Sequence, residues 1–131
     1  MINMPIVSEL TPDERKHYID ALRNRPPFPE PTPEVRAEHE RLMVLVRKAA
    51  EMLKIRFGAK RVILFGSMAQ PLFFRLDSDI DIAFEGIAVD DYWKAWREVE
   101  EIIEDKSIDF IDIADAKDSV KKAIQRYGVE L

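Results

Sequence analysis

Cysteine is absent from the 131-residue sequence, which excludes disulfide bonds, thiolate metal sites and cysteine nucleophiles. Long hydrophobic runs are also absent: apolar runs such as Val62–Phe65 fall far short of the roughly 20 residues that span a bilayer. The N-terminus does not show the basic-then-apolar pattern of a signal peptide. We therefore expect a soluble, cytoplasmic protein that does not associate with a membrane.

Basic residues are outnumbered, with 20 Lys and Arg against 25 Asp and Glu and a formal net charge of -5. A nonspecific nucleic-acid binder needs a basic face, so we expect no direct contact with nucleic acid. Residues 77–112 hold 13 of the acidic residues and only three of the basic ones. A solvated acidic helix near residues 98–105 explains part of this excess. Aspartates inside strands need another reason, because strands disfavour this residue.

The N-terminal third of the chain divides into a helix and a linker. Thr11–Glu14 has the residues of a capping box, and the helix that it starts is expected to run to about Arg25, with an apolar stripe of Tyr18, Ala21 and Leu22. Five of the eight prolines lie within residues 24–33, which predicts an extended linker. We therefore predict an N-terminal helix and proline-rich linker in residues 1–33 and one main domain in residues 34–131.

The main domain shows alternating helical and strand patterns. A helix is expected from Thr32 to Gly58, because apolar positions recur at steps of three and four: Val35, His39, Leu42, Val46, Ala49 and Leu53. Strands are expected at 61–65, 78–85 and 107–113, and helices at 90–105 and 118–127. In the helix at 90–105, Trp93, Trp96, Val99 and Ile103 are expected to face inward. The pattern predicts an α/β (α+β) fold with a short sheet.

Two aspartates lie two residues apart in the second predicted strand. Asp79 and Asp81 leave the same face of that strand, and like charges on a half-buried face repel each other. A divalent cation between them would remove this repulsion, and hard oxygen ligands favour Mg²⁺ or Mn²⁺ over Zn²⁺. The alternative interpretation is an edge strand with one wet, charged face.

Gly66 and Ser67 follow the first predicted strand directly. Glycine permits a tight turn and a close backbone approach, and the amides of such a turn together with a serine hydroxyl can hold phosphate oxygens. The alternative is an ordinary turn that ends a strand.

A third acidic strand contains Asp109 and Asp112, which point to opposite faces, so only one of them can accompany Asp79 and Asp81. Periodicity alone does not choose between the two. Three carboxylates on neighbouring strands beside a phosphate-holding turn are typical of two-metal phosphoryl or nucleotidyl transfer. The third carboxylate can complete the second metal site and take the proton of the acceptor.

These segments together resemble the minimal nucleotidyltransferase (MNT) family of the polymerase-beta superfamily, over roughly residues 35–131. The resemblance is carried by Leu64–Ala69 (LFGSMA), Asp77–Ala83 (DSDIDIA) and Ile108–Asp112 (IDFID). It implies a short mixed sheet with helices packed on one face. It also implies catalytic and metal-binding roles for Asp79, Asp81 and Asp109, and contacts of Gly66 and Ser67 with the triphosphate of ATP.

The resemblance further implies a metal-dependent nucleotidyltransferase that moves AMP from ATP onto a hydroxyl group. Members of this family are commonly paired with a HEPN-domain ribonuclease toxin, and the MNT protein is the antitoxin that adenylylates a toxin tyrosine. The main domain leaves no residues for a second substrate-binding domain, so the acceptor is expected from a partner chain or from a second copy in a homo-oligomer. Two alternatives remain open: a homodimeric transferase for small molecules, and an idle antitoxin that inhibits by binding.

Other candidate residues receive a structural interpretation. His17 and His39 have no second ligand at metal-binding spacing, so structural or surface roles are favoured. Arg75 could equally reach a phosphate or shield the acidic site. The family usually has a glycine where Pro71 or Leu72 stands. The apolar segment 71–74 is therefore a candidate docking surface.

Overall fold

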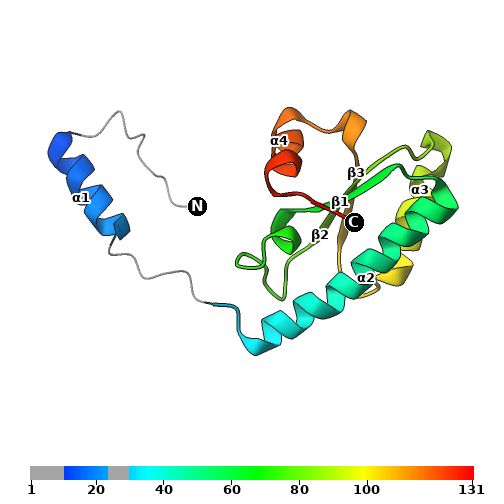
Figure 1. Ribbon diagram of the computed structural model, residues 1–131, viewed down its shortest axis with the longest axis horizontal. Coiled ribbons are helices and arrows are strands. Elements are labelled where there is room, and N and C mark those ends of the chain that lie inside the picture. The colour runs from blue at the N-terminus through cyan, green and yellow to red at the C-terminus, as the bar shows by residue number, and fades with distance from the viewer. Residues whose placement is uncertain (1–10, 24–29) are drawn as a thin grey trace.

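The computed structural model describes residues 11–23 and 30–131, and Figure 1 shows how their elements are arranged. Helix α1 (Pro12–Arg23) begins with the predicted capping box. The amide of Glu14 donates to Thr11 Oγ1 at 3.2 Å, and the amide of Thr11 donates to Glu14 Oε2 at 3.1 Å. The side chains of the predicted apolar stripe and residues 24–29 of the predicted proline linker lie outside what the structure describes.

Helix α2 (Pro33–Phe57) has the predicted bounds, because both of its ends are set by local signals. Thr32 accepts a hydrogen bond from the amide of Val35, and Gly58 closes the helix in the left-handed region at φ 71°. The predicted inward face is confirmed by the burial of Leu42, Val46, Ala49 and Leu53.

The sheet has four strands in the order β3-β2-β1-β4. Strand β1 (Arg61–Phe65) pairs antiparallel with β2 (Ile80–Glu85) and β4 (Val129–Glu130), whereas β2 pairs parallel with β3 (Ile108–Asp112). The predicted α/β (α+β) class with a mixed sheet is therefore confirmed. The two-residue strand β4 was not among the predicted elements.

Helices lie on both sides of this sheet (Figure 1). Helices α2 and α3 (Tyr92–Ile102) cover the face that carries Leu64, Ile82 and Phe110, and this face forms the larger core. The structure adds a helix on the second face, where Ile124 of α4 (Asp118–Tyr127) packs with a smaller cluster: Ile63, Phe65 and Ala83. Among the described residues, no helix is long and apolar enough to cross a membrane.

The prediction for Trp93 was wrong. A 3-10 helix, Val89–Asp91, precedes α3, and Tyr92 rather than Trp93 takes the first inward position. The ring of Tyr92 lies 5.7 Å from those of Phe84 and Phe110. Trp93 is one residue further round the helix and is 71% exposed. The other predicted inward residues hold, since Trp96 is half-buried and Val99 and Ile103 are buried.

Candidate active site

Two of the predicted carboxylates lie side by side at one end of the sheet. The parallel register of β2 and β3 places Asp81 directly opposite Asp109, so both side chains leave the same face. Asp112 is opposite Phe84 near the other end of β2, and its side chain leaves the opposite face. The register therefore brings Asp109, and not Asp112, to Asp81.

Asp81 is the half-buried member of the acidic group. Burial, a hydrogen bond with Asp109 and the negative charges of Asp109 and Asp79 raise the pKa of Asp81 from 3.8 to about 6. Asp79 precedes β2 and, like Asp109, is exposed. The three predicted carboxylates thus influence one another, and Asp81 is the one whose charged form is disfavoured.

The turn after β1 lies against this carboxylate. Gly66 starts a short 3-10 helix, η2 (Gly66–Ala69), and has φ 70°. A Cβ atom at position 66 would lie 2.0 Å from Asp81 Oδ2. Only glycine therefore fits here, for its conformation and for the contact. Ser67 follows in the same turn and is partly exposed, so the structure brings both predicted phosphate-contacting residues to the acidic group.

A histidine on α2 contacts this turn. His39 Nε2 lies 2.8 Å from the backbone carbonyl oxygen of Met68, which is buried. The ring of His39 also meets that of Phe74 edge-on at 5.1 Å between centroids. The predicted structural role of His39 is therefore to hold the η2 turn through the carbonyl group of Met68. The sequence pattern placed His39 on the inward face of α2, but it held no signal for a partner 29 residues away.

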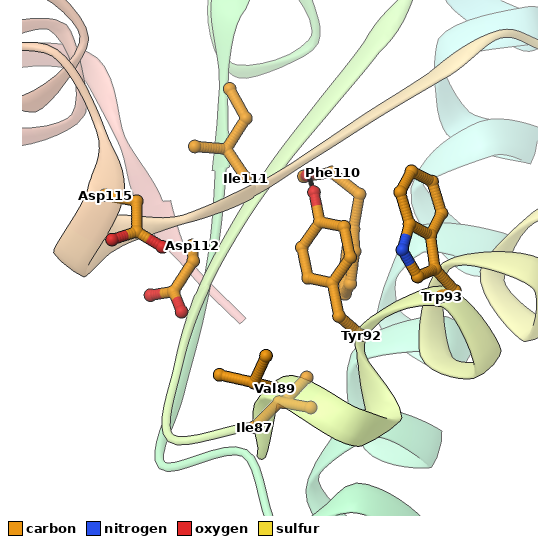
Figure 2. A pocket seen from close by; sticks show the side chains of 8 residues that line it. All are labelled: Ile87, Val89, Tyr92, Trp93, Phe110, Ile111, Asp112 and Asp115. Atoms are coloured by element: carbon orange, nitrogen blue, oxygen red, sulfur yellow. Dashed lines mark hydrogen bonds between the residues drawn. The ribbon is translucent and has the colours of Figure 1, made fainter.

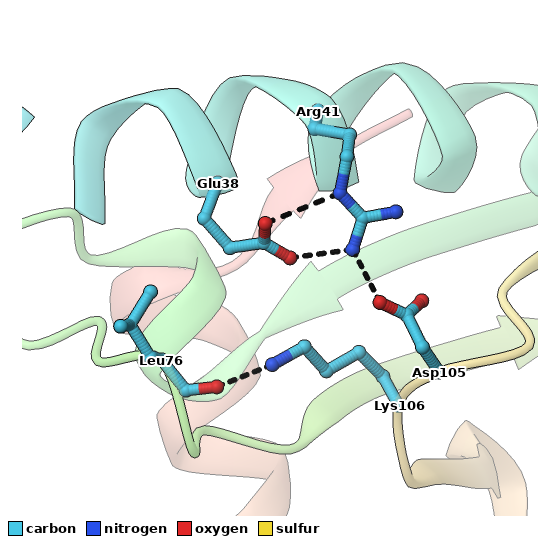
Figure 3. Close-up of polar contacts among 5 residues, drawn as sticks. All are labelled: Glu38, Arg41, Leu76, Asp105 and Lys106. Atoms are coloured by element: carbon cyan, nitrogen blue, oxygen red, sulfur yellow. Dashed lines mark hydrogen bonds and ion pairs between the residues drawn. The ribbon is translucent and has the colours of Figure 1, made fainter. Parts of the chain in front are cut away.

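The loop between η2 and β2 is held by bonds to its own backbone. Arg75 Nη1 donates to the carbonyl oxygens of Leu72 and Phe74 at 3.0 and 2.7 Å, and its amide donates to Ser78 Oγ at 2.9 Å. Lys106 Nζ donates to the carbonyl oxygen of Leu76 (Figure 3). In this structure the guanidinium of Arg75 therefore stabilises the loop through its backbone carbonyl oxygens.

The N-terminal half of α2 is tied to the same region by an ion-pair group (Figure 3). One nitrogen of Arg41 lies 2.5 Å from Glu38 Oε1 and 2.5 Å from Asp105 Oδ2, next to Lys106 in the chain. Arg41 and Asp105 are exposed and Glu38 is partly exposed, so each pair contributes little to stability by itself. Their effect is to fix the connection between α2, the loop and the start of β3.

The comparison with protein families identifies the fold around this site. The family model described as polymerase beta, nucleotidyltransferase matches residues 47–131, which is more than half of the chain. The chain belongs to this nucleotidyltransferase family. The matched region contains the η2 turn and all three predicted carboxylates, and the predicted membership of the polymerase-beta nucleotidyltransferases is confirmed.

Solved structures resemble this nucleotidyltransferase in fold. A chain of the toxin–antitoxin MntA–HepT crystal structure is 18% identical with a TM-score of 0.50, and the match covers 67% of this chain and 69% of that one. A chain of a toxin–antitoxin crystallised with AMP-PNP is 20% identical with a TM-score of 0.49, and the match covers 70% of each chain. A chain from the complex of a tri-AMPylated Shewanella oneidensis HEPN toxin with an MNT antitoxin is 17% identical with a TM-score of 0.44, and the match covers 72% of this chain and 69% of that one. No curated protein matches the chain.

The donor set of this nucleotidyltransferase fits a hard divalent cation in kind. Carboxylate oxygens are the ligands that Mg²⁺ and Mn²⁺ prefer. Burial and the neighbouring carboxylates raise the pKa of Asp81, and a bound cation would offset both effects. Within the described residues, no group of three His, Cys, Asp or Glu side chains is already arranged to hold an ion. Asp81 and Asp109 are in place, whereas Asp79 lies on the segment that enters β2.

Proposed function

We propose that the chain is a metal-dependent nucleotidyltransferase that transfers AMP from ATP to a hydroxyl group, expected to be a tyrosine, of a partner HEPN ribonuclease toxin. As a protein adenylyltransferase of this kind it acts as an antitoxin. The observation that carries the proposal is the carboxylate pair, with Asp81 opposite Asp109 and Gly66 against Asp81. The toxin partner is supported by the resemblance of the quoted motifs to MNT proteins and by the likeness in fold to the MntA–HepT toxin–antitoxin.

The proposed roles follow from exposure and position. The acceptor oxygen attacks the α-phosphorus of ATP, the bond from that phosphorus to the bridging oxygen breaks, and pyrophosphate leaves with that oxygen. Asp109 is exposed and can take the proton of the acceptor hydroxyl. Gly66 allows the turn to lie close to Asp81. Ser67 in that turn offers a hydroxyl and a backbone amide to the triphosphate. Mg²⁺ or Mn²⁺, when held by Asp79, Asp81 and Asp109, supplies charge neutralisation for the triphosphate.

The test is intact-mass analysis of a HEPN toxin encoded beside this chain and co-expressed with it. The proposal expects the toxin to gain whole AMP units with wild-type protein and to gain none with Asp81→Asn. Glu101→Gln is the matched control, because it removes one exposed negative charge of α3 away from Asp81. A toxin that keeps its unmodified mass after co-expression with folded wild-type protein would refute the proposal.

The same experiment separates the two alternative functions. An unmodified toxin whose ribonuclease activity is nevertheless blocked by a stoichiometric complex would identify an antitoxin that acts by binding. Transfer of AMP from labelled ATP to aminoglycosides, with no transfer to the toxin, would identify a small-molecule transferase. Either result overturns the proposed acceptor.

A further inference from the structure

A pocket lies away from the carboxylate pair, between the end of β3 and the start of α3 (Figure 2). Its volume is about 320 Å³. Eight residues line it: Ile87, Val89, Tyr92, Trp93, Phe110, Ile111, Asp112 and Asp115. Asp81, Asp109 and Gly66 are not among them, so the pocket is separate from the candidate active site.

One side of this pocket is apolar and open to solvent. Val89 is 85% exposed and Trp93 is 71% exposed. The indole of Trp93 stacks on that of Trp96, with 5.5 Å between ring centroids and 4° between planes. The indole of Trp93 also meets the ring of Tyr92 edge-on, with 5.3 Å between ring centroids, and Figure 2 shows both rings at the pocket. Exposed apolar residues that gather round a cavity mark a binding surface.

The other side of the pocket is acidic. Asp112 and Asp115 lie next to each other there (Figure 2), and the lining contains no lysine or arginine. Within the part of the chain that the structure describes, neither carboxylate forms an ion pair. Asp112 Oδ1 accepts from the amide of Ala114 at 3.0 Å, which fixes the direction of that carboxylate. Together with burial, the two negative charges raise the pKa of Tyr92.

We infer that this pocket is a docking site for an arginine side chain that a partner protein presents. A guanidinium can pair with carboxylates through its planar fork of donors and stack on an aromatic face, whereas an ammonium does neither as well. The aliphatic stem of the arginine and its apolar neighbours would cover Val89 and Ile87. Cation–π contact with Trp93 and pairing with Asp115 are the two sources of affinity.

A partner of opposite charge fits better than a second copy of this chain. The pocket is acidic on one side, and the whole chain carries a net charge of -5, so two copies repel each other at this surface. The inference goes beyond the proposed AMP transfer, and its test needs neither ATP nor a toxin.

The test uses the two indole N–H signals of the protein, since Trp93 and Trp96 are its only tryptophans. The ¹⁵N-labelled protein is titrated with acetyl-Leu-Arg-Leu-amide, with the same peptide carrying glutamine, and with free arginine. We expect a saturable shift of the Trp93 signal at millimolar arginine peptide, and little change with the glutamine peptide. Free arginine should bind more weakly, because it lacks the apolar neighbours that cover Val89.

Three variants test the named contacts. Trp93→Ala replaces an exposed side chain and should weaken binding about fivefold or more, read from the Trp96 signal. Asp115→Asn should weaken binding about threefold, and added salt should reduce this difference. The matched control is Glu101→Gln, which removes one exposed negative charge of α3 outside the pocket and should bind as wild type does.

Four outcomes would overturn the inference. Equal binding of the glutamine peptide would show an apolar cleft without a preference for arginine. Equal binding of free arginine would point to a small-molecule ligand. Shifts that depend on protein concentration, with a dimer in sedimentation, would show that a second copy covers the pocket. No shift up to tens of millimolar peptide would show that arginine does not bind here.

Discussion

Replacing Asp81 by asparagine should stabilise the metal-free protein while it abolishes AMP transfer. The pKa of Asp81 is raised from 3.8 to about 6, so the folded protein disfavours the charged carboxylate relative to the unfolded chain. Below the unfolded pKa, both states are protonated and no penalty exists. As pH rises from about 4 to about 6, the penalty develops, and above the folded pKa it is complete.

The magnitude follows from the size of the shift. The full difference corresponds to about 3 kcal/mol at 1.36 kcal/mol per unit, but the side chain is still partly solvated, which reduces the expected effect to about 1 kcal/mol near pH 7. For a chain of this size, that is an increase in Tm of about 3 °C. Asparagine can also donate to Asp109, so the neighbouring group keeps a partner.

The assay is chemical or thermal unfolding in EDTA at about pH 7 and about pH 4, with Asp112→Asn as control. Asp112 accepts from the amide of Ala114 through an oxygen that asparagine retains, so the control should stay within about 0.5 kcal/mol of wild type. Asp81→Asn should gain stability at the higher pH and lose most of this gain at the lower one. A variant that is less stable than wild type at both pH values would refute the electrostatic reasoning.

Further variants test the other members of the site. Asp109→Asn should abolish AMP transfer to the toxin, measured with labelled ATP, and Asp112→Asn should keep most of it at saturating toxin, because Asp112 lines the docking pocket and not the active site; the reverse would show a different active register. Ser67→Ala should slow transfer at least about tenfold with an unchanged Tm, and a wild-type rate would exclude the phosphate contact. His39→Ala should weaken ATP binding in calorimetry by disturbing η2, whereas His39→Gln, which keeps a donor for the carbonyl of Met68, should recover part of it.

The parts of the fold that were predicted from the sequence depend on local chemistry. Thr32 and Gly58 set the ends of α2 through a side-chain cap and a left-handed glycine, and each signal lies within a few residues of its effect. The strand at 61–65 was predicted through its apolar content, and the strand at 80–85 lies within the 78–85 predicted from period-two alternation. The two-residue β4 has no such pattern, because it exists only through its pairing with β1.

The parts that were not predicted depend on contacts between distant segments. Side-chain parity showed only that Asp109 and Asp112 cannot share a face, and it was the resemblance to a family that selected Asp109. The physical cause of that choice, the pairing register of β2 with β3, is not visible in the sequence pattern. The exposure of Trp93 follows from where α3 begins, since Tyr92 takes the inward place. No property of residues 37–41 indicates that His39 meets the carbonyl of Met68.

The two proposed sites together predict where a partner must be touched. Asp109 begins the β3 segment that ends at Asp112, and three residues of strand span about 10 Å. Asp109 and Asp112 leave opposite faces, but β3 is the edge strand of the described sheet, so an extended segment of a partner that pairs with it places alternate side chains on both faces, one at the pocket and one at the carboxylate pair. The acceptor tyrosine of the toxin should therefore lie about three or more residues, or an equivalent distance in space, from an exposed arginine. Alanine at that arginine should raise KM for the toxin and leave kcat nearly unchanged, since docking and chemistry use different residues. A toxin whose modified tyrosine has no arginine within about 15 Å would contradict this arrangement.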